Sequence, residues 1–465
     1  MRGRAGSWTK RLRADLDRSL FPQAPAGGGI GFGRWEGAAV LVAFLALASI
    51  LHLLRAGASD SLTSLWAEDG AVFLHGALSQ GFLDAVTSSY AGYLVLVPRL
   101  IGEVGASVPL EDAPVAMNLA AVLVVALSGL AVWFGSSAHV RDPFLRGLLV
   151  ALTVLCPVAS LEAVVSGTYD SWYMIFAVFW LLLWRPNATW SAALGALFIF
   201  VTGLTTPGIA FFIPLAALRA LAIRDRRDAL IVGSFTLALA IQLPVTALNS
   251  EDVIEHAWSA DAWPTYAQRV VEASVLGENL GGQAWSSWGW QFLIPFVAAG
   301  VALLAVAFAR ASSGRLLAAI AVVTSLTMFM VTYYQRAIGA VMLWPDSYAF
   351  GLGGRYALVP SLLLISSALV LVGPSTNAAR GRGRGRPWAT IAVGGVLLVA
   401  LVTSFDLSNS AIRKMPPWQD SLRAAASTCR AKDLAETHVG VSPPGVVMYI
   451  PCERLESAFD QPPAR

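Results

Sequence analysis

The sequence alternates between long apolar blocks and short polar segments, with few amphipathic stretches between them. Because a helix needs about 20 mainly apolar residues to cross the hydrocarbon core of a bilayer, each long block predicts a membrane-spanning helix. Eleven blocks qualify, of which the fourth is short: about 36–54, 113–134, 147–165, 172–184, 189–204, 207–223, 229–248, 286–308, 316–334, 357–373 and 388–404. The pattern therefore predicts an all-α polytopic membrane protein.

One further apolar stretch, residues 93–108, is shorter and contains Arg99 and Glu103. If this stretch does not cross the membrane, the segments on the same side of the membrane as the N-terminus hold 20 of the 32 basic residues but only six of the 29 acidic ones. If it did cross, the basic clusters Arg224–Arg227 and Arg380–Arg386 would face outward, against the positive-inside rule. We therefore expect 93–108 to lie in the outer interface, with the N-terminus cytoplasmic and the C-terminus extracytoplasmic.

Composition agrees with a membrane protein and excludes other classes. The chain is 56% hydrophobic and 13% charged, which excludes a disordered chain and a soluble two-domain enzyme. A net charge of +3 argues against a nucleic-acid partner, which requires a basic face. Lysine is nearly absent, whereas arginine, alanine and glycine are abundant. Because those residues have GC-rich codons, we expect the plasma membrane of a high-GC bacterium.

Three parts follow from this pattern: a basic leader (1–35), a transmembrane domain (36–404) with its first outer loop at 55–112, and an extracytoplasmic segment (405–465). In the leader, apolar residues recur every four positions among basic ones, at Trp8, Leu12, Leu16 and Leu20. This spacing fits an amphipathic helix on the anionic inner leaflet, or a plain cytoplasmic tail.

Two of the three cysteines, Cys429 and Cys452, lie in the extracytoplasmic segment. An oxidising compartment favours a disulfide between them, with two free thiols as the alternative. Cys156 lies inside a predicted span, where a packing role is expected.

The polar chemistry is concentrated just outside the predicted spans. Transporters and proton-coupled proteins usually carry ionisable residues in the middle of spans. Here Glu162 is the main exception, near the outer end of the third span. This distribution suits an enzyme whose substrate is anchored in the outer leaflet.

The first outer loop contains two adjacent carboxylates, Glu68 and Asp69, which open an amphipathic helix. Partial desolvation at the interface raises the pKa of a carboxylate toward the range that a general base needs. The alternative is structural, with Asp69 serving only to cap the helix that follows.

Three arginines lie on the outer side, against the charge rule: Arg99, Arg336 and Arg355. A guanidinium can hold phosphate through two parallel hydrogen bonds. Snorkelling to lipid headgroups is the alternative for Arg99. Together with the acidic pair, these arginines predict a site that binds a lipid phosphate and activates a hydroxyl group.

The first outer loop resembles that of the GT-C superfamily of integral-membrane glycosyltransferases. The resemblance lies in Trp66-Ala67-Glu68-Asp69-Gly70-Ala71-Val72-Phe73, followed by Tyr90-Ala91-Gly92-Tyr93 and Val97-Pro98-Arg99-Leu100, and in a later Gly354-Arg355-Tyr356. These motifs look like those of a poorly characterised bacterial subgroup. The local match covers about 55–105, and elsewhere only the topology is similar.

The resemblance implies a polyprenyl-phosphate sugar donor and an acidic residue of the first outer loop that deprotonates the acceptor. That role falls on Asp69, with Glu68 as its neighbour or as a carboxylate for a divalent cation. Asp170 corresponds to an acid that many members carry in a second outer loop. Tyr93 and Tyr356, within the matching motifs, are expected at the substrate together with the three arginines.

We therefore expect a glycosyltransferase that moves a hexose or pentose from a polyprenyl phosphate to a cell-envelope glycan or glycolipid. A lipid-linked sugar flippase or transporter is one alternative, and it predicts a polar path through the spans. An O-antigen-type polymerase or ligase is another, and it would place its essential residues in a late outer loop. In a non-catalytic scaffold, Glu68 and Asp69 would only cap a helix.

Overall fold

The computed structural model describes residues 13–23, 34–57, 62–159, 161–249, 259–311, 314–335, 353–372, 387–407 and 417–459. Helices dominate these residues, and their only strands form two short antiparallel hairpins. The predicted all-α polytopic fold is confirmed, because six of the described helices are long and apolar enough to cross a membrane. These are α2 (Arg34–Arg55), α7 (Ala113–Gly135), α12 (Arg226–Leu248), α15 (Trp290–Arg310), α16 (Arg315–Gln335) and α18 (Arg355–Val372).

Shorter apolar helices complete the bundle. They are α8 (Pro143–Val154), α9 (Asp170–Leu183), α10 (Thr189–Thr205), the 3₁₀ helix η5 (Pro207–Phe212) with α11 (Ile213–Leu221), and α19 (Pro387–Thr403). Helix α9 forms the centre of the core, and its Phe176, Phe179 and Trp180 are fully buried. It packs against α7, α10 and α18, so nearly every side chain along it contacts protein rather than lipid.

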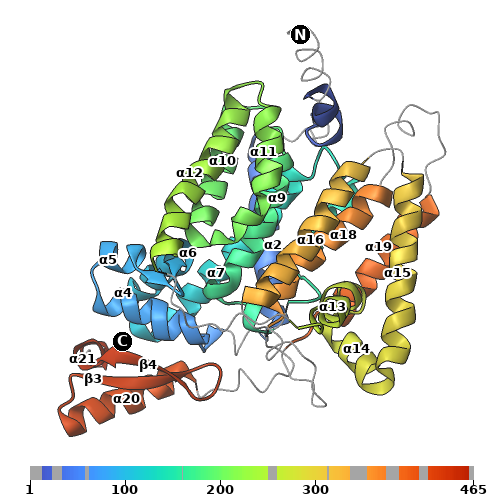
Figure 1. Ribbon diagram of the computed structural model, residues 1–465. Helices are drawn as coiled ribbons and strands as arrows, with labels where there is room; N and C mark the ends of the chain where they lie inside the picture. Colours follow the sequence, from blue (N-terminus) through green and yellow to red (C-terminus); the bar gives the residue numbers. More distant parts are fainter. Residues whose placement is uncertain are drawn as a thin grey trace.

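The segments predicted to lie outside gather at one end of the bundle, opposite the N-terminal helix (Figure 1). In the first outer loop these are the π-helix η1 (Asp69–Leu74), α4 (His75–Ser79), α5 (Phe82–Thr87), β1 (Ser89–Tyr90), β2 (Tyr93–Leu94), α6 (Leu96–Ala106) and the 3₁₀ helix η2 (Leu110–Asp112). From later segments come α13 (Ala262–Tyr266), the π-helix η6 (Ala267–Glu272) and α14 (Ala273–Trp288). The end of the bundle formed by these elements is called the loop end.

Helix α6 covers most of the stretch 93–108 that the charge pattern excluded from crossing. Its 11 residues span only about 16 Å at 1.5 Å per residue, far less than a bilayer core. One face of α6 is buried against η1 and α7. The helix therefore belongs to the loop end and supports η1.

The predicted span 147–165 is wrong in its second half. Helix α8 ends at Val154, and residues 155–159 and 161–169 follow an irregular path with two 3₁₀ turns, η3 (Leu161–Ala163) and η4 (Gly167–Tyr169). Pro157 lacks the N–H that a continuing helix needs, and Val165 has a positive φ of 55°. The side chains of His52 and Arg55 in α2 bind backbone carbonyls of Val154 and Ala159, which have no helical partners there. This irregular segment carries part of the candidate site.

The amphipathic leader helix packs on the protein. Residues 13–19 are helical, and the side chains of Leu16, Leu20 and Phe21 are buried in the main core. Asp17 pairs with Arg185 and Arg224 of neighbouring segments. The apolar face that the sequence assigned to the inner leaflet is therefore covered by protein along these residues. Trp8 and Leu12 lie outside the described residues.

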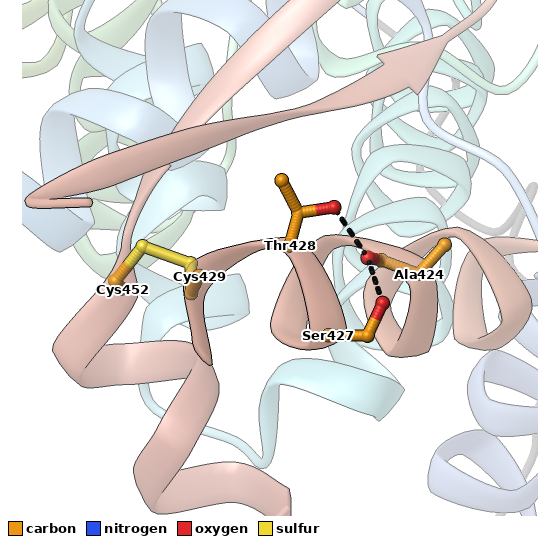
Figure 2. The surroundings of a disulfide bond; sticks show 5 residues. All are labelled: Ala424, Ser427, Thr428, Cys429 and Cys452. Atoms are coloured by element: carbon orange, nitrogen blue, oxygen red, sulfur yellow. Dashed lines mark hydrogen bonds between the residues drawn. A yellow bond between two sulfur atoms is a disulfide. The ribbon is translucent and has the colours of Figure 1, made fainter. Parts of the chain in front are cut away.

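The C-terminal segment folds into a small unit of α20 (Trp418–Lys432), β3 (Glu436–Val441), β4 (Val446–Pro451) and α21 (Cys452–Phe459). The two strands pair in antiparallel register from Glu436 opposite Pro451 to Val441 opposite Val446. The predicted disulfide between Cys429 and Cys452 is present and joins α20 to the start of α21 (Figure 2). Directly before Cys429, Ser427 and Thr428 donate hydrogen bonds to the carbonyl of Ala424, one turn back along α20.

This C-terminal unit docks on the first outer loop. The backbone N–H of Ser442 donates to the carbonyl of Leu65 at 2.9 Å, and the indole of Trp418 donates to the carbonyl of Leu110 at 2.8 Å. Gly70 allows close contact, since a Cβ there would meet the side chain of Val441 at 2.7 Å. The hairpin thus packs directly behind the helix that begins with Asp69.

Candidate functional site

Asp69 is the first residue of η1, and its side chain points away from that helix. Its Oδ1 accepts two hydrogen bonds from Thr168, from the backbone N–H at 2.8 Å and from the hydroxyl at 2.6 Å. No cap hydrogen bond to η1 is formed by Glu68, which holds the N-cap position. Asp69 therefore joins the first outer loop to the segment 155–169, and the helix-cap alternative is wrong.

The environment of Asp69 suits a proton acceptor. The residue is 2% exposed, and among the described residues its Oδ2 has no hydrogen-bond partner. Burial raises the pKa of Asp69 to about 6, interactions with Thr168 and the nearby hydroxyl of Ser166 lower it, and the charge of Glu68 raises it further. One oxygen is thus fixed, and the other keeps its lone pairs for a substrate proton.

Glu68 and Asp170 both lie near this carboxylate. The hydroxyl of Tyr169 donates to Oε1 of Glu68 at 3.1 Å. Burial raises the pKa of Tyr169, so its hydroxyl stays protonated as a donor. Asp170, which precedes the predicted span 172–184, is 1% exposed, and burial followed by the charge of Asp69 raises its pKa. The structure therefore brings three of the predicted carboxylates together.

Arg355 reaches the same cluster from the start of α18. Its Nη1 donates to Oε2 of Glu162 at 2.8 Å, and its guanidinium lies over the ring of Tyr169 at 4.5 Å. Its Nη2 donates to the hydroxyl of Tyr356 at 3.2 Å. Tyr356 in turn meets Trp172 edge to face, with ring centroids 5.6 Å apart. A guanidinium has five N–H donors, so these bonds leave donors for an anionic substrate.

Two glycines let the site assemble. A Cβ on Gly167 would lie 3.0 Å from the side chain of Ile101 and 3.5 Å from Oδ1 of Asp69. A Cβ on Gly102 would lie 2.6 Å from the carbonyl oxygen of Phe73. A larger residue at either position would separate α6 from η1 or from the segment that carries Thr168.

The structure places Arg99 behind η1. Its Nη1 donates to the carbonyl of Val72 at 3.2 Å, and its guanidinium lies 5.1 Å from the centre of the Phe73 ring. Burial lowers the pKa of Arg99, whereas the neighbouring Tyr90 raises it. These contacts hold the helix that carries Asp69, and binding of phosphate by Arg99 stays a prediction.

Two further predicted site residues, Tyr93 and Arg336, have a substrate role that the structure does not test. Tyr93 is half-buried in β2, within the small hairpin that precedes α6. Arg336 lies outside the described residues. Their expected contact with substrate stays a prediction.

Three residues of the cluster were not predicted as site residues: Glu162, Thr168 and Tyr169. The sequence indicated that Glu162 is unusual, because it was the main ionisable residue inside a predicted span. Thr168 and Tyr169 directly precede Asp170, but their residue types are common in outer loops. Only the fold reveals that they bond with Asp69 and Glu68.

No group of three His, Cys, Asp or Glu side chains in the described part of the chain is spaced to hold a metal ion. Glu68 instead accepts the hydrogen bond from Tyr169. The divalent cation that the resemblance left open, with Glu68 as its carboxylate, stays a prediction.

Comparisons with known proteins give a distant likeness to a solved structure. No protein-family model matches the chain, and no curated protein matches it in sequence. Among solved structures, the chain is similar to ArnT from Cupriavidus metallidurans bound to undecaprenyl phosphate, with 14% identity over 79% of this chain and 75% of that chain. The TM-score is 0.39. At this level of similarity, the function has to be inferred from the side chains of this chain itself.

Proposed function

We propose that this protein is a membrane glycosyltransferase that moves a sugar from a polyprenyl phosphate to a cell-envelope glycan or glycolipid. The observation that carries this proposal is the buried Asp69, which has one oxygen fixed by Thr168 and one without a hydrogen-bond partner among the described residues. Tyr169, which follows Thr168, lies under the guanidinium of Arg355 at the start of the apolar helix α18. A hydroxyl acceptor and a lipid-linked donor would meet there, at the loop end of the bundle.

In the proposed reaction the acceptor hydroxyl oxygen attacks the anomeric carbon of the donor sugar. The bond between that carbon and the phosphate oxygen breaks, and the polyprenyl phosphate leaves as an anion. Asp69 takes the proton of the attacking hydroxyl on Oδ2. A base with a pKa of about 6 is largely ionised at neutral pH and remains basic enough to accept this proton.

Arg355 is the best-placed cation for the departing phosphate. Fixed cations stabilise negative charge as it develops in the transition state, and they act more strongly in a partly dehydrated site. Glu162 and the two tyrosine rings hold the guanidinium in one orientation. In this proposal Arg99 holds η1, while Arg336, Tyr93 and Tyr356 contribute to substrate binding. Asp170 would orient the acceptor.

The proposed location is the bacterial plasma membrane, with the N-terminus in the cytoplasm and the loop end outside. The positive-inside distribution of the sequence supports this orientation. Basic residues of the opposite end, such as Arg219 and Arg227, lie in segments that the sequence assigned to the cytoplasm. The donor's prenyl chain would lie in the membrane against the apolar helices.

The test is transfer by the full-length protein in liposomes, supplied with a panel of polyprenyl-phosphate hexoses and pentoses and an envelope glycolipid extract. Release of free polyprenyl phosphate and labelling of the acceptor are both measured. The Asp69→Asn variant is expected to lose transfer by about a hundredfold or more, the usual contribution of a general base.

Asp84→Asn is the matched control, because Asp84 is an exposed carboxylate of the same outer loop. It should transfer sugar like the wild type. Full activity of Asp69→Asn would remove this residue from the mechanism. Movement of intact lipid-linked sugar between leaflets, without release of the lipid phosphate, would instead identify a flippase.

A further inference from the structure

His52 lies near the end of α2, where its ring holds the irregular segment 155–169. Its Nδ1 is 2.8 Å from the carbonyl oxygen of Val154, and its Nε2 accepts the N–H of Val165 at 3.4 Å. A carbonyl oxygen can only accept, so Nδ1 carries the ring proton and Nε2 is left as an acceptor. One neutral imidazole therefore joins both sides of this segment to a long apolar helix.

The backbone that His52 holds is strained. Val165 is a β-branched residue with a φ of 55°, a conformation that such residues rarely adopt. Strained backbone persists only where surrounding contacts fix it, and it is concentrated at functional sites. The bond from the Val165 N–H to His52 is one such contact, and the residue is fully buried.

Tyr173 of α9 and Arg55 of α2 hold this segment as well. The His52 ring meets Tyr173 edge to face at 5.7 Å, and the hydroxyl of Tyr173 donates to the carbonyl of Ala163 at 3.0 Å. The Nη2 of Arg55 donates to the carbonyl of Ala159 at 3.3 Å. Thr168, which donates to Asp69, follows Val165 by only three residues.

We propose that His52 is a positioning residue for the transfer reaction, since its ring fixes the conformation of 161–169 that presents Thr168 to Asp69 and Tyr169 to Glu68. This inference rests on the proposed function. Loss of the His52 bonds would loosen the two hydrogen bonds on Oδ1 of Asp69. Because those bonds favour the ionised carboxylate, their loss would raise the pH at which Asp69 becomes an effective base.

The test uses His52→Phe in the full-length protein in liposomes. Phenylalanine keeps a ring beside Tyr173 but removes both hydrogen bonds. We expect kcat to fall about ten- to a hundredfold, as for a misplaced catalytic group, with a smaller change in KM for the lipid donor. The acidic limb of the kcat/KM profile should move to higher pH. In His52→Gln, the side-chain amide can still accept a hydrogen bond from Val165. This variant should therefore recover part of the kcat and shift the acidic limb less than His52→Phe does.

Leu54→Ala is the matched control, because Leu54 lies near the same helix end with a half-exposed side chain. It should leave kcat and the pH profile unchanged. A His52→Phe variant with the kcat and acidic limb of the wild type would overturn the proposal. So would a fall in activity without any movement of the limb, since that result fits a merely structural role.

Hydrogen–deuterium exchange separates this proposal from the proposed function. In His52→Phe, amide exchange should rise in 155–169 while α7 and α20 exchange at the wild-type rate. If the wild type transfers no sugar, the proposed function fails, and unchanged exchange in 155–169 would then also overturn the role of His52. If the wild type transfers sugar and Asp69→Asn does not, the proposed function is supported, and this result does not depend on the outcome for the His52 variants.

Discussion

Thr168 donates two hydrogen bonds to a single carboxylate oxygen of Asp69, across 99 residues of sequence. This arrangement fixes the carboxylate and leaves Oδ2 without a partner among the described residues. Hydrogen bonds to the ionised form partly offset the cost of burying it. The pair thus connects the geometry of the site to its expected pH dependence.

The transfer rate should depend on the ionisation of Asp69. Because the base acts only when unprotonated, and burial raises its pKa to about 6, kcat/KM is expected to rise with pH and reach half of its maximum near pH 6. The measurement is a pH profile of initial rates in liposomes. An acidic limb near pH 4, the range of an ordinary aspartate, would contradict the burial of this carboxylate.

Thr168→Val should move that limb. The variant keeps the backbone bond but removes the hydroxyl bond to Oδ1, so the pKa of Asp69 is expected to rise further and the limb to shift toward higher pH. Thr168→Ser retains a hydroxyl and should follow the wild type. Identical profiles for the valine and serine variants would show that the hydroxyl bond does not tune this acid.

Replacing Arg355 and replacing Glu162 should have coupled effects on the free energy of unfolding. Replacing both should not restore sugar transfer. Glu162 is 1% exposed, so Arg355→Met removes a buried ion pair and should destabilise the protein by about 3 kcal/mol. Adding Glu162→Gln is expected to restore most of the stability and none of the transfer. Thermal unfolding and transfer assays of both single variants and the double variant measure the coupling.

Recovery of transfer in the Arg355→Met/Glu162→Gln double variant would argue against a role for the guanidinium at the phosphate. Arg355→Lys is the second control. It keeps the charge but loses the planar group, so it should bind donor more weakly than the wild type.

The disulfide should matter for the C-terminal unit and, through it, for the site. Cys429 and Cys452 are 23 residues apart, and closing a loop of that size stabilises by about 3 kcal/mol in the chain-entropy model. Replacing both by serine should therefore loosen the hairpin that packs behind Gly70 and reduce transfer. Limited proteolysis of the C-terminal unit provides the measurement, with Cys156→Ser as control. Equal proteolysis of the two variants would contradict this coupling.

The sequence by itself determined the class of fold, because the requirement for apolar length in a bilayer acts on each helix separately. It excluded 93–108 from crossing, since the rule on basic residues acts on whole segments, and the short α6 agrees. It also singled out Glu68, Asp69, Asp170 and Arg355, because ionisable residues at the edge of apolar blocks are costly and therefore stand out.

Only the tertiary structure decided which of these residues meet. The backbone at the end of α8 is held by a distant helix, since His52 binds the carbonyl of Val154 and Arg55 binds that of Ala159. The packing of Leu16 and Leu20 against protein depends on a surface that those residues do not encode. Likewise, Thr168 and Glu162 carry no signal of the partners they find in Asp69 and Arg355. Local rules fix where helices form, whereas side-chain partners depend on the chain path between them.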